Sequence, residues 1–192
     1  MTETVLKLLA IAFLLAPLAV ASTAPGRTET VLTQIVRSGF VIGRWSSLLL
    51  LLVQLSVVVL RSVFSVSFIW LQESALYLFG AIFLLSSGAL LLMEGHVRVD
   101  ILYTKLSETR KALVDLVGLS ALVLPLAILI IWVSWSYVGT SWSQLERSSE
   151  PTGIHAVFLL KSMIPGFAVL IALAAEVRII QIVRSLRGPT DA

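Results

Sequence analysis

The stretch Glu94-Gly95-His96-Val97-Arg98-Val99-Asp100 separates two long uncharged runs, residues 74–93 and residues 116–145. Each run can cross the hydrocarbon core of a bilayer, because a membrane-spanning helix needs only about 20 apolar residues. A helix is the expected form, since it satisfies its own backbone hydrogen bonds in lipid. The charged heptapeptide between these runs therefore predicts a polytopic membrane protein.

The composition of the whole chain points the same way. Of its 192 residues, 58% are hydrophobic and 13% are charged, and the mean hydropathy is +1.00, whereas a soluble domain typically carries about 25% charged residues. The formal charge of +3 does not indicate a nucleic-acid binder, because the basic residues lie at span ends. The absence of cysteine excludes disulfides, thiolate catalysis and cysteine-ligated metals.

We predict an all-α integral membrane fold, a bundle of four transmembrane helices over residues 40–60, 68–93, 116–137 and 154–183. Aromatic residues near the span ends are expected to anchor the helices at the membrane interfaces: Trp45, Trp70, Trp132, Trp135 and Trp142.

Several finer features of the bundle are predicted as well. Apolar residues at helical spacing predict amphipathic surface helices over residues 31–40 and 100–116, the second with a helix start near Ser107. Pro125 should kink the third span. Three glycines are expected at close helix contacts: Gly80, Gly88 and Gly118.

The distribution of basic residues predicts the orientation. Arg61 and Arg147, with Lys161, fall on one side of the predicted spans. The other side carries ten lysines and arginines, which places the 94–115 loop and the C-terminus in the cytoplasm: Arg27, Arg37, Arg44, Arg98, Lys105, Arg110, Lys111, Arg178, Arg184 and Arg187.

The N-terminal segment, residues 1–21, allows two interpretations. Its apolar run ends at Ala19-Val20-Ala21, which resembles a signal-peptidase site. Cleavage would, however, deliver Arg27, Arg37 and Arg44 to the outside, against the charge rule. Retention as an extra hydrophobic helix is therefore favoured, and residues 22–192 form a single four-span domain.

A search for chemistry finds no catalytic motif, metal site or cofactor site. The two histidines, His96 and His155, both lie at span ends, but on opposite sides of the membrane in the predicted topology. They therefore cannot share a metal or haem. A self-sufficient carrier usually shows either a chain of acids across the membrane or a span that is unwound at its middle. The sequence shows neither. The chain is predicted to be a non-enzymatic helper of another membrane protein.

Charged residues near the spans need partners, because an ionisable group costs roughly 2.5 to 3.5 kcal/mol at the bilayer centre. Arg61 and Glu73 could form a salt bridge closing a hairpin, or each could extend independently to the headgroups. Lys161 lies four residues before Pro165, and either extends to the interface or contacts a partner subunit or lipid. Glu176 is interpreted as part of an ordinary cytoplasmic helix end.

Four landmarks in order resemble the DctQ family, the small membrane subunits of TRAP transporters, over roughly residues 40–183. They are Arg61-Ser62-Val63-Phe64, Trp70-Leu71-Gln72-Glu73, His96-Val97-Arg98-Val99-Asp100 and Lys161-Ser162-Met163-Ile164-Pro165. The last two are similar to members grouped with mannitol or chloroaromatic uptake. Ser62 departs from the family, which usually has an aromatic residue there.

The resemblance implies a small permease subunit in the bacterial inner membrane. Its partners would be a large DctM-like elevator subunit, a periplasmic substrate-binding protein and membrane lipids, and together they would import an organic acid with sodium. The small subunit would act as a scaffold. The resemblance assigns partner or lipid contacts, or structural ion pairs, to five residues: Arg61, Glu73, Arg98, Asp100 and Lys161.

Two other classes share the helix count. A tetraspan anchor of a respiratory complex, binding quinone or haem, would need histidines facing each other at membrane depth. A small membrane-embedded enzyme would need clustered polar residues inside the bundle, yet only Gln54 is conspicuously polar in the first span. The sequence favours the transporter helper over both.

Overall fold

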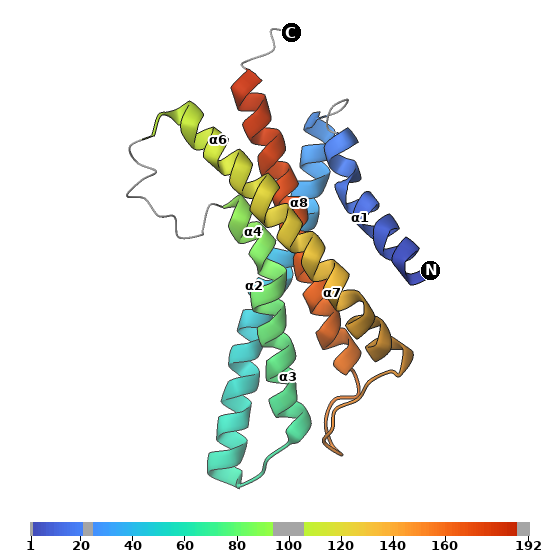
Figure 1. Cartoon of the computed structure of the whole chain (residues 1–192). Coiled ribbons are helices and arrows are strands. Elements are labelled where there is room, and N and C mark those ends of the chain that lie inside the picture. Colours follow the sequence, from blue (N-terminus) through green and yellow to red (C-terminus); the bar gives the residue numbers. More distant parts are fainter. Residues whose placement is uncertain (1, 21–24, 94–105, 188–192) are drawn as a thin grey trace.

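The computed structural model describes residues 2–20, 25–93 and 106–187, and every regular element in them is a helix. Figure 1 shows an elongated bundle. Its elements, in chain order, are α1 (Thr2–Val20), α2 (Pro25–Phe64), α3 (Ile69–Gly80), η1 (Ala81–Leu85), α4 (Ser86–Leu92), α6 (Glu108–Gly118), η2 (Leu119–Val123), α7 (Leu124–Ser143) and α8 (Val157–Arg187).

Four helical stretches are long and apolar enough to cross a membrane, which confirms the predicted fold class. They cover Gly26–Phe64, Ile69–Leu92, Glu108–Ser143 and Val157–Leu186. The α2–α3 and α7–α8 connections lie at one end of the bundle, which we call the hairpin end (Figure 1). The opposite end, where α2 begins and α8 finishes, is called the tail end.

The first predicted surface helix is wrong as a separate element, because residues 31–40 continue directly into the first span. The resulting helix α2 has 40 residues, or about 60 Å at 1.5 Å per residue. Leu32 and Val36 are buried in the core cluster, so this part of α2 packs on the bundle. The predicted helix start at Ser107 is confirmed, since Ser107 is the N-cap of α6.

Helix α2 packs along a narrow stripe whose members recur every three or four residues, the spacing of a coiled-coil seam. Its buried residues are Leu32, Val36, Gly39, Gly43 and Ser46. A Cβ on Gly39 would meet the carbonyl oxygen of Leu85, and one on Gly43 would meet Oγ of Ser86. These two glycines form a GxxxG motif, which lets helix backbones approach closely in membranes.

The predicted glycine contacts are partly confirmed. A Cβ on Gly88 would lie 2.5 Å from the carbonyl oxygen of Leu170 in α8, and one on Gly80 would lie 3.0 Å from Sδ of Met163. Gly118, in contrast, has nothing within 4 Å of such a Cβ, so its assignment was wrong. Small residues thus set the approach of α4 and η1 to α2 and α8.

Two of the spans contain a π-helical turn, η1 and η2. The second ends at Val123, and α7 then begins with Pro125 in its first two positions. The irregularity in this span therefore lies before the proline, where the missing N–H and the ring disturb the helix ladder.

Candidate functional site

The carboxylate of Glu73 ties the two hairpins together at the hairpin end. Glu73 lies in the second turn of α3, and its carboxylate accepts hydrogen bonds from Oγ of Ser148 and, at 2.5 Å, from the backbone N–H of Ile154. Both donors belong to the connection between α7 and α8. One side chain of α3 therefore holds a loop that lies more than seventy residues further along the chain.

The held loop, residues 144–156, has an internal structure that fits around this carboxylate. The N–H of Ser148 donates to the carbonyl of Ile154 at 3.2 Å, and the N–H of Gly153 donates to the carbonyl of Glu150 at 3.0 Å. A Cβ on Gly153 would lie 2.7 Å from Oε1 of Glu73. The loop backbone approaches the carboxylate closely because this position has no side chain.

Lys161 forms a second polar contact at the same end. Its ammonium nitrogen lies 2.5 Å from Oε2 of Glu146 and 4.0 Å from the ring centroid of Tyr137. The Lys161 side chain is only 17% exposed. The charge is thus neutralised by an acid and an aromatic face, and the start of α8 is fixed to the end of α7.

Aromatic packing strengthens the junction between α7 and α8. The indole Nε1 of Trp142 donates to Oγ of Ser162 at 2.7 Å, and its ring centroid lies 4.6 Å from that of Phe158. Half-buried aromatic pairs of this kind add to the energy of area burial alone.

The Lys161 contact also affects the acidity of its partner. Glu146 lies in the loop, outside the membrane-spanning helices, and the hydrogen bond from Lys161 holds the pKa of the Glu146 carboxyl below its ordinary value. Glu146 is therefore an anion at neutral pH, and the ion pair is formed.

We call the set of Glu73, Glu146, Ser148, Ile154 and Lys161 the loop lock. Its charged groups are engaged with the loop and with each other. Among the described ranges, no group of three histidines or acids could hold a metal ion. What this arrangement does is fix the shape of an exposed loop at the end of the bundle.

A protein-family model matches most of the chain. The family model described as "Tripartite ATP-independent periplasmic transporters, DctQ component" matches residues 49–185, well over half of the chain. The chain belongs to the DctQ family. It is a small membrane subunit of a TRAP transporter, associated with the other components of such a system, and the respiratory-anchor alternative is not supported. No curated protein and no solved structure matches this DctQ chain.

The predicted site residues of this DctQ subunit differ in the contacts that they make. Of the two alternatives for Arg61 and Glu73, the salt bridge was wrong, because the Glu73 carboxylate bonds to the α7–α8 loop instead. Arg61 lies exposed near the end of α2. Lys161 has the ion pair described above, while Arg98 and Asp100 lie outside the described residues.

The predicted interfacial tryptophans differ in exposure. Most present a large exposed surface, and the Arg44 guanidinium lies 5.8 Å from the ring centroid of Trp45. Trp135 instead packs against the core cluster. Trp135, which was predicted as an interfacial anchor, therefore also contributes to the packing of the bundle.

Two features at the tail end of the DctQ subunit were not predicted from the sequence. Glu29 at the start of α2 accepts hydrogen bonds from Gln181 at 2.8 Å and from Arg184 at 3.0 Å, which joins α2 to the end of α8. Glu176 is completely buried, and its carboxylate has no hydrogen-bond partner among the described residues. Its interpretation as part of a solvated helix end was wrong, because α8 continues to Arg187.

Proposed function

We propose that this DctQ subunit is a scaffold for the large elevator subunit of its TRAP transporter, which imports an organic acid together with sodium. The substrate class and the coupling ion come from the family resemblance. The observation that supports a scaffold most directly is the loop lock, because the charged groups at the hairpin end fix a loop instead of lining a passage.

The fixed loop offers a surface for the periplasmic binding protein. Arg147, Glu150 and His155 lie exposed along residues 144–156. Glu73 and Lys161 bond to the same loop from helices α3 and α8. A surface that keeps one conformation loses less entropy when a partner docks on it. The loop lock would therefore favour productive contact with the loaded binding protein.

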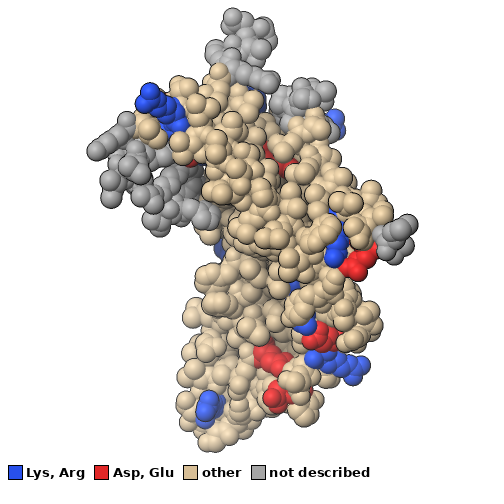
Figure 2. Space-filling model, in the orientation of Figure 1, with Lys and Arg blue, Asp and Glu red and all other residues tan. Residues whose placement is uncertain are grey.

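The membrane-facing surface suits a large partner. Helix α2 buries only its narrow stripe, and its other faces present apolar side chains, among them Leu48, Leu52 and Leu55. Figure 2 shows a largely uncharged surface, on which charged residues form only small, separate groups. Lipid and the large subunit would share this surface.

The proposed orientation places the hairpin end in the periplasm. Arg61 and Arg147 lie at this end, with Lys161 close by. More basic residues lie toward the tail end, on the first part of α2, the start of α6 and the terminal part of α8: Arg27, Arg37, Arg110, Lys111, Arg178 and Arg184. The excess of basic residues at the tail end supports its location in the cytoplasm. The loop lock then faces the compartment from which the binding protein arrives.

Reconstitution separates a scaffold from a carrier. Liposomes holding this chain alone should take up radioactive sodium no faster than protein-free liposomes. Sodium flux through the lone chain, at a rate that grows with the amount of protein, would contradict the scaffold.

Co-purification tests the role of the loop lock. A tagged Ser148→Ala variant should retain the large subunit, because the loop does not form the membrane surface, but should bind the binding protein more weakly than wild type. Ser149→Ala is the matched control, since Ser149 is an exposed neighbour outside the lock. Equal binding by the two variants would argue against a role for the fixed loop.

A further inference from the structure

Helix α1 is docked on the bundle by contacts that a discarded leader would not need. We infer that residues 2–20 remain on the mature chain as a fifth membrane helix, clamped to α7 by Glu3, Lys7 and Ser136. The Glu3 end of this helix lies on the side of the hairpin end, and its Val20 end lies at the tail end. This inference rests on the orientation proposed above, but it does not depend on the large subunit.

The apolar residues of α1 divide into an inner and an outer face. Leu14 is buried in the core cluster, and Leu18 packs against it. Phe13 and Leu9 point away from the bundle, and Phe13 is 84% exposed. A helix with packed residues on one face and large apolar residues on the other is suited to a position between a bundle and lipid.

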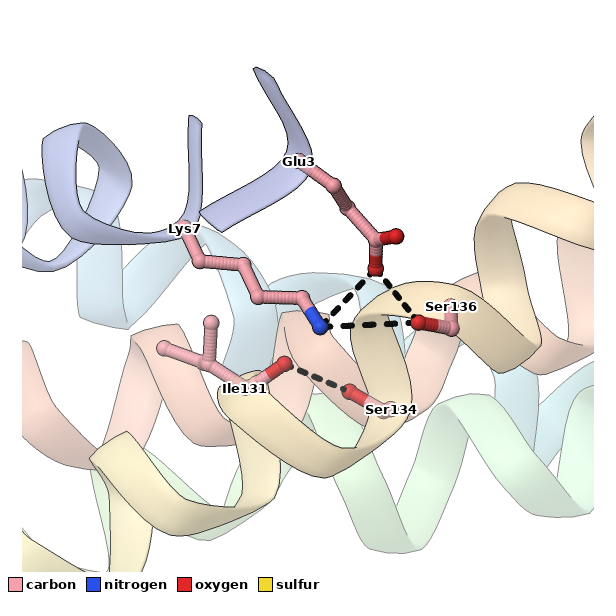
Figure 3. Close-up of polar contacts among 5 residues, drawn as sticks. All are labelled: Glu3, Lys7, Ile131, Ser134 and Ser136. Carbon is pink, nitrogen blue, oxygen red and sulfur yellow. Dashed lines mark hydrogen bonds and ion pairs between the residues drawn. The ribbon is translucent and has the colours of Figure 1, made fainter. Parts of the chain in front are cut away.

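The charged residues of α1 contact α7, although the Glu3 side chain remains 56% exposed. Glu3 and Lys7 are the only charged residues in the helix, and they lie four positions apart on one face. The Lys7 nitrogen lies 2.9 Å from Oε1 of Glu3 and 3.4 Å from Oγ of Ser136, and Ser136 donates to the same Glu3 oxygen at 2.5 Å. Figure 3 shows both side chains reaching from α1 to α7.

The clamp neutralises these charges within its own contacts. The Lys7 side chain is only 13% exposed, and its nitrogen lies 5.3 Å from the ring centroid of Trp132. Charges that have partners can be tolerated near lipid, whereas unpaired charges are costly there. The partner Ser136 lies in α7, so the match is with the folded bundle and not with the export machinery.

The direction of α1 places the cleavage-like sequence out of reach. The clamp lies beside Trp132 and Ser136 on α7, and α1 leads from there toward the start of α2, where Glu29 pairs with Arg184 (Figure 1). In the proposed orientation, Ala19 therefore lies toward the cytoplasm. Signal peptidase cuts on the opposite side of the membrane, so the folded chain does not present this sequence to it.

The mass of the chain purified from membranes tests retention. We expect an intact mass that includes residues 2–20. A chain cut after Ala21 would begin at Ser22 and lack 21 of the 192 residues, and finding it as the main species would overturn the inference.

Cross-linking tests the docking and its direction, and the chain has no cysteine of its own to interfere. The double variant Glu3→Cys with Ser136→Cys should cross-link in membranes with a short thiol-specific reagent. Phe13→Cys with Ser136→Cys is the control pair, because Phe13 points away from the bundle. A retained chain that cross-links no better in the first pair than in the second would contradict the docking of α1 on α7.

Discussion

At the scale of single residues, Gly153 shows how tightly the loop lock is assembled. Because an added Cβ would lie 2.7 Å from Oε1 of Glu73, Gly153→Ala should displace either the carboxylate or the loop. We expect the melting temperature of the purified subunit to fall by several degrees. Ser149→Ala, in the same loop, should leave it unchanged. Equal melting temperatures for Gly153→Ala and wild type would show that the loop yields without cost.

The Lys161–Glu146 pair should give the subunit a specific response to acid. Because the native pKa of Glu146 is lowered, the pair stabilises the fold above the ordinary carboxyl pKa of about 4.3. This stabilisation is lost as the pH falls through the lower, native pKa. The difference in melting temperature between wild type and Glu146→Gln should therefore be constant near neutral pH and close in acid. A difference that stays constant down to the most acid pH would contradict this assignment.

Residue types and spacing could not reveal the partners of these charges. The sequence indicated that Glu73 and Lys161 needed partners, but for Glu73 it offered only Arg61, which lies across the same short connection. The true partners lie in residues 144–156, whose fold depends on backbone hydrogen bonds and on Gly153. The signal that was available, and missed, was Glu146 as an acid between two spans close to Lys161.

At the scale of helices, the GxxxG motif of α2 decides how closely α2 meets η1 and α4. Gly39→Ala should place a methyl group against the carbonyl oxygen of Leu85. Overpacking of this kind typically costs about 1 to 3 kcal/mol. We expect lower thermal stability in detergent for this variant.

Gly139→Ala in α7 is the matched control for that substitution. Nothing lies within 4 Å of a Cβ at Gly139, and alanine is the better helix former. This variant should be as stable as wild type or more stable. If Gly39→Ala were as stable as wild type, the contact of Gly39 with the Leu85 carbonyl oxygen would not limit how closely α2 approaches η1.

The membrane-spanning helices could largely be predicted from the sequence, whereas their exact boundaries and their contacts with one another could not. Hydropathy located the spans because a membrane helix must be apolar along its length. The boundary near residue 40 was wrong, because an amphipathic pattern looks the same in a separate surface helix and in the start of a longer one. Leu32 and Val36 face α8 and the core, and this contact is tertiary.

At the scale of the whole molecule, the orientation can be tested by labelling, because the chain has no native cysteine. Ser149→Cys at the hairpin end should react with a membrane-impermeant maleimide in intact cells whose outer membrane is permeable. Leu186→Cys at the tail end should react only after the inner membrane is opened. The reverse pattern would overturn the assignment from basic residues.

The great length of α2 conceals a short apolar segment. Only 16 residues separate Arg44 from Arg61, or about 24 Å of helix. The uncharged residues 116–143 on the rod of α6, η2 and α7 would extend about 42 Å. A lipid slab of uniform thickness cannot match both, so the bilayer thins beside α2 or the rod leans. The stability of this subunit in the bilayer should therefore depend on the acyl-chain length of the lipids.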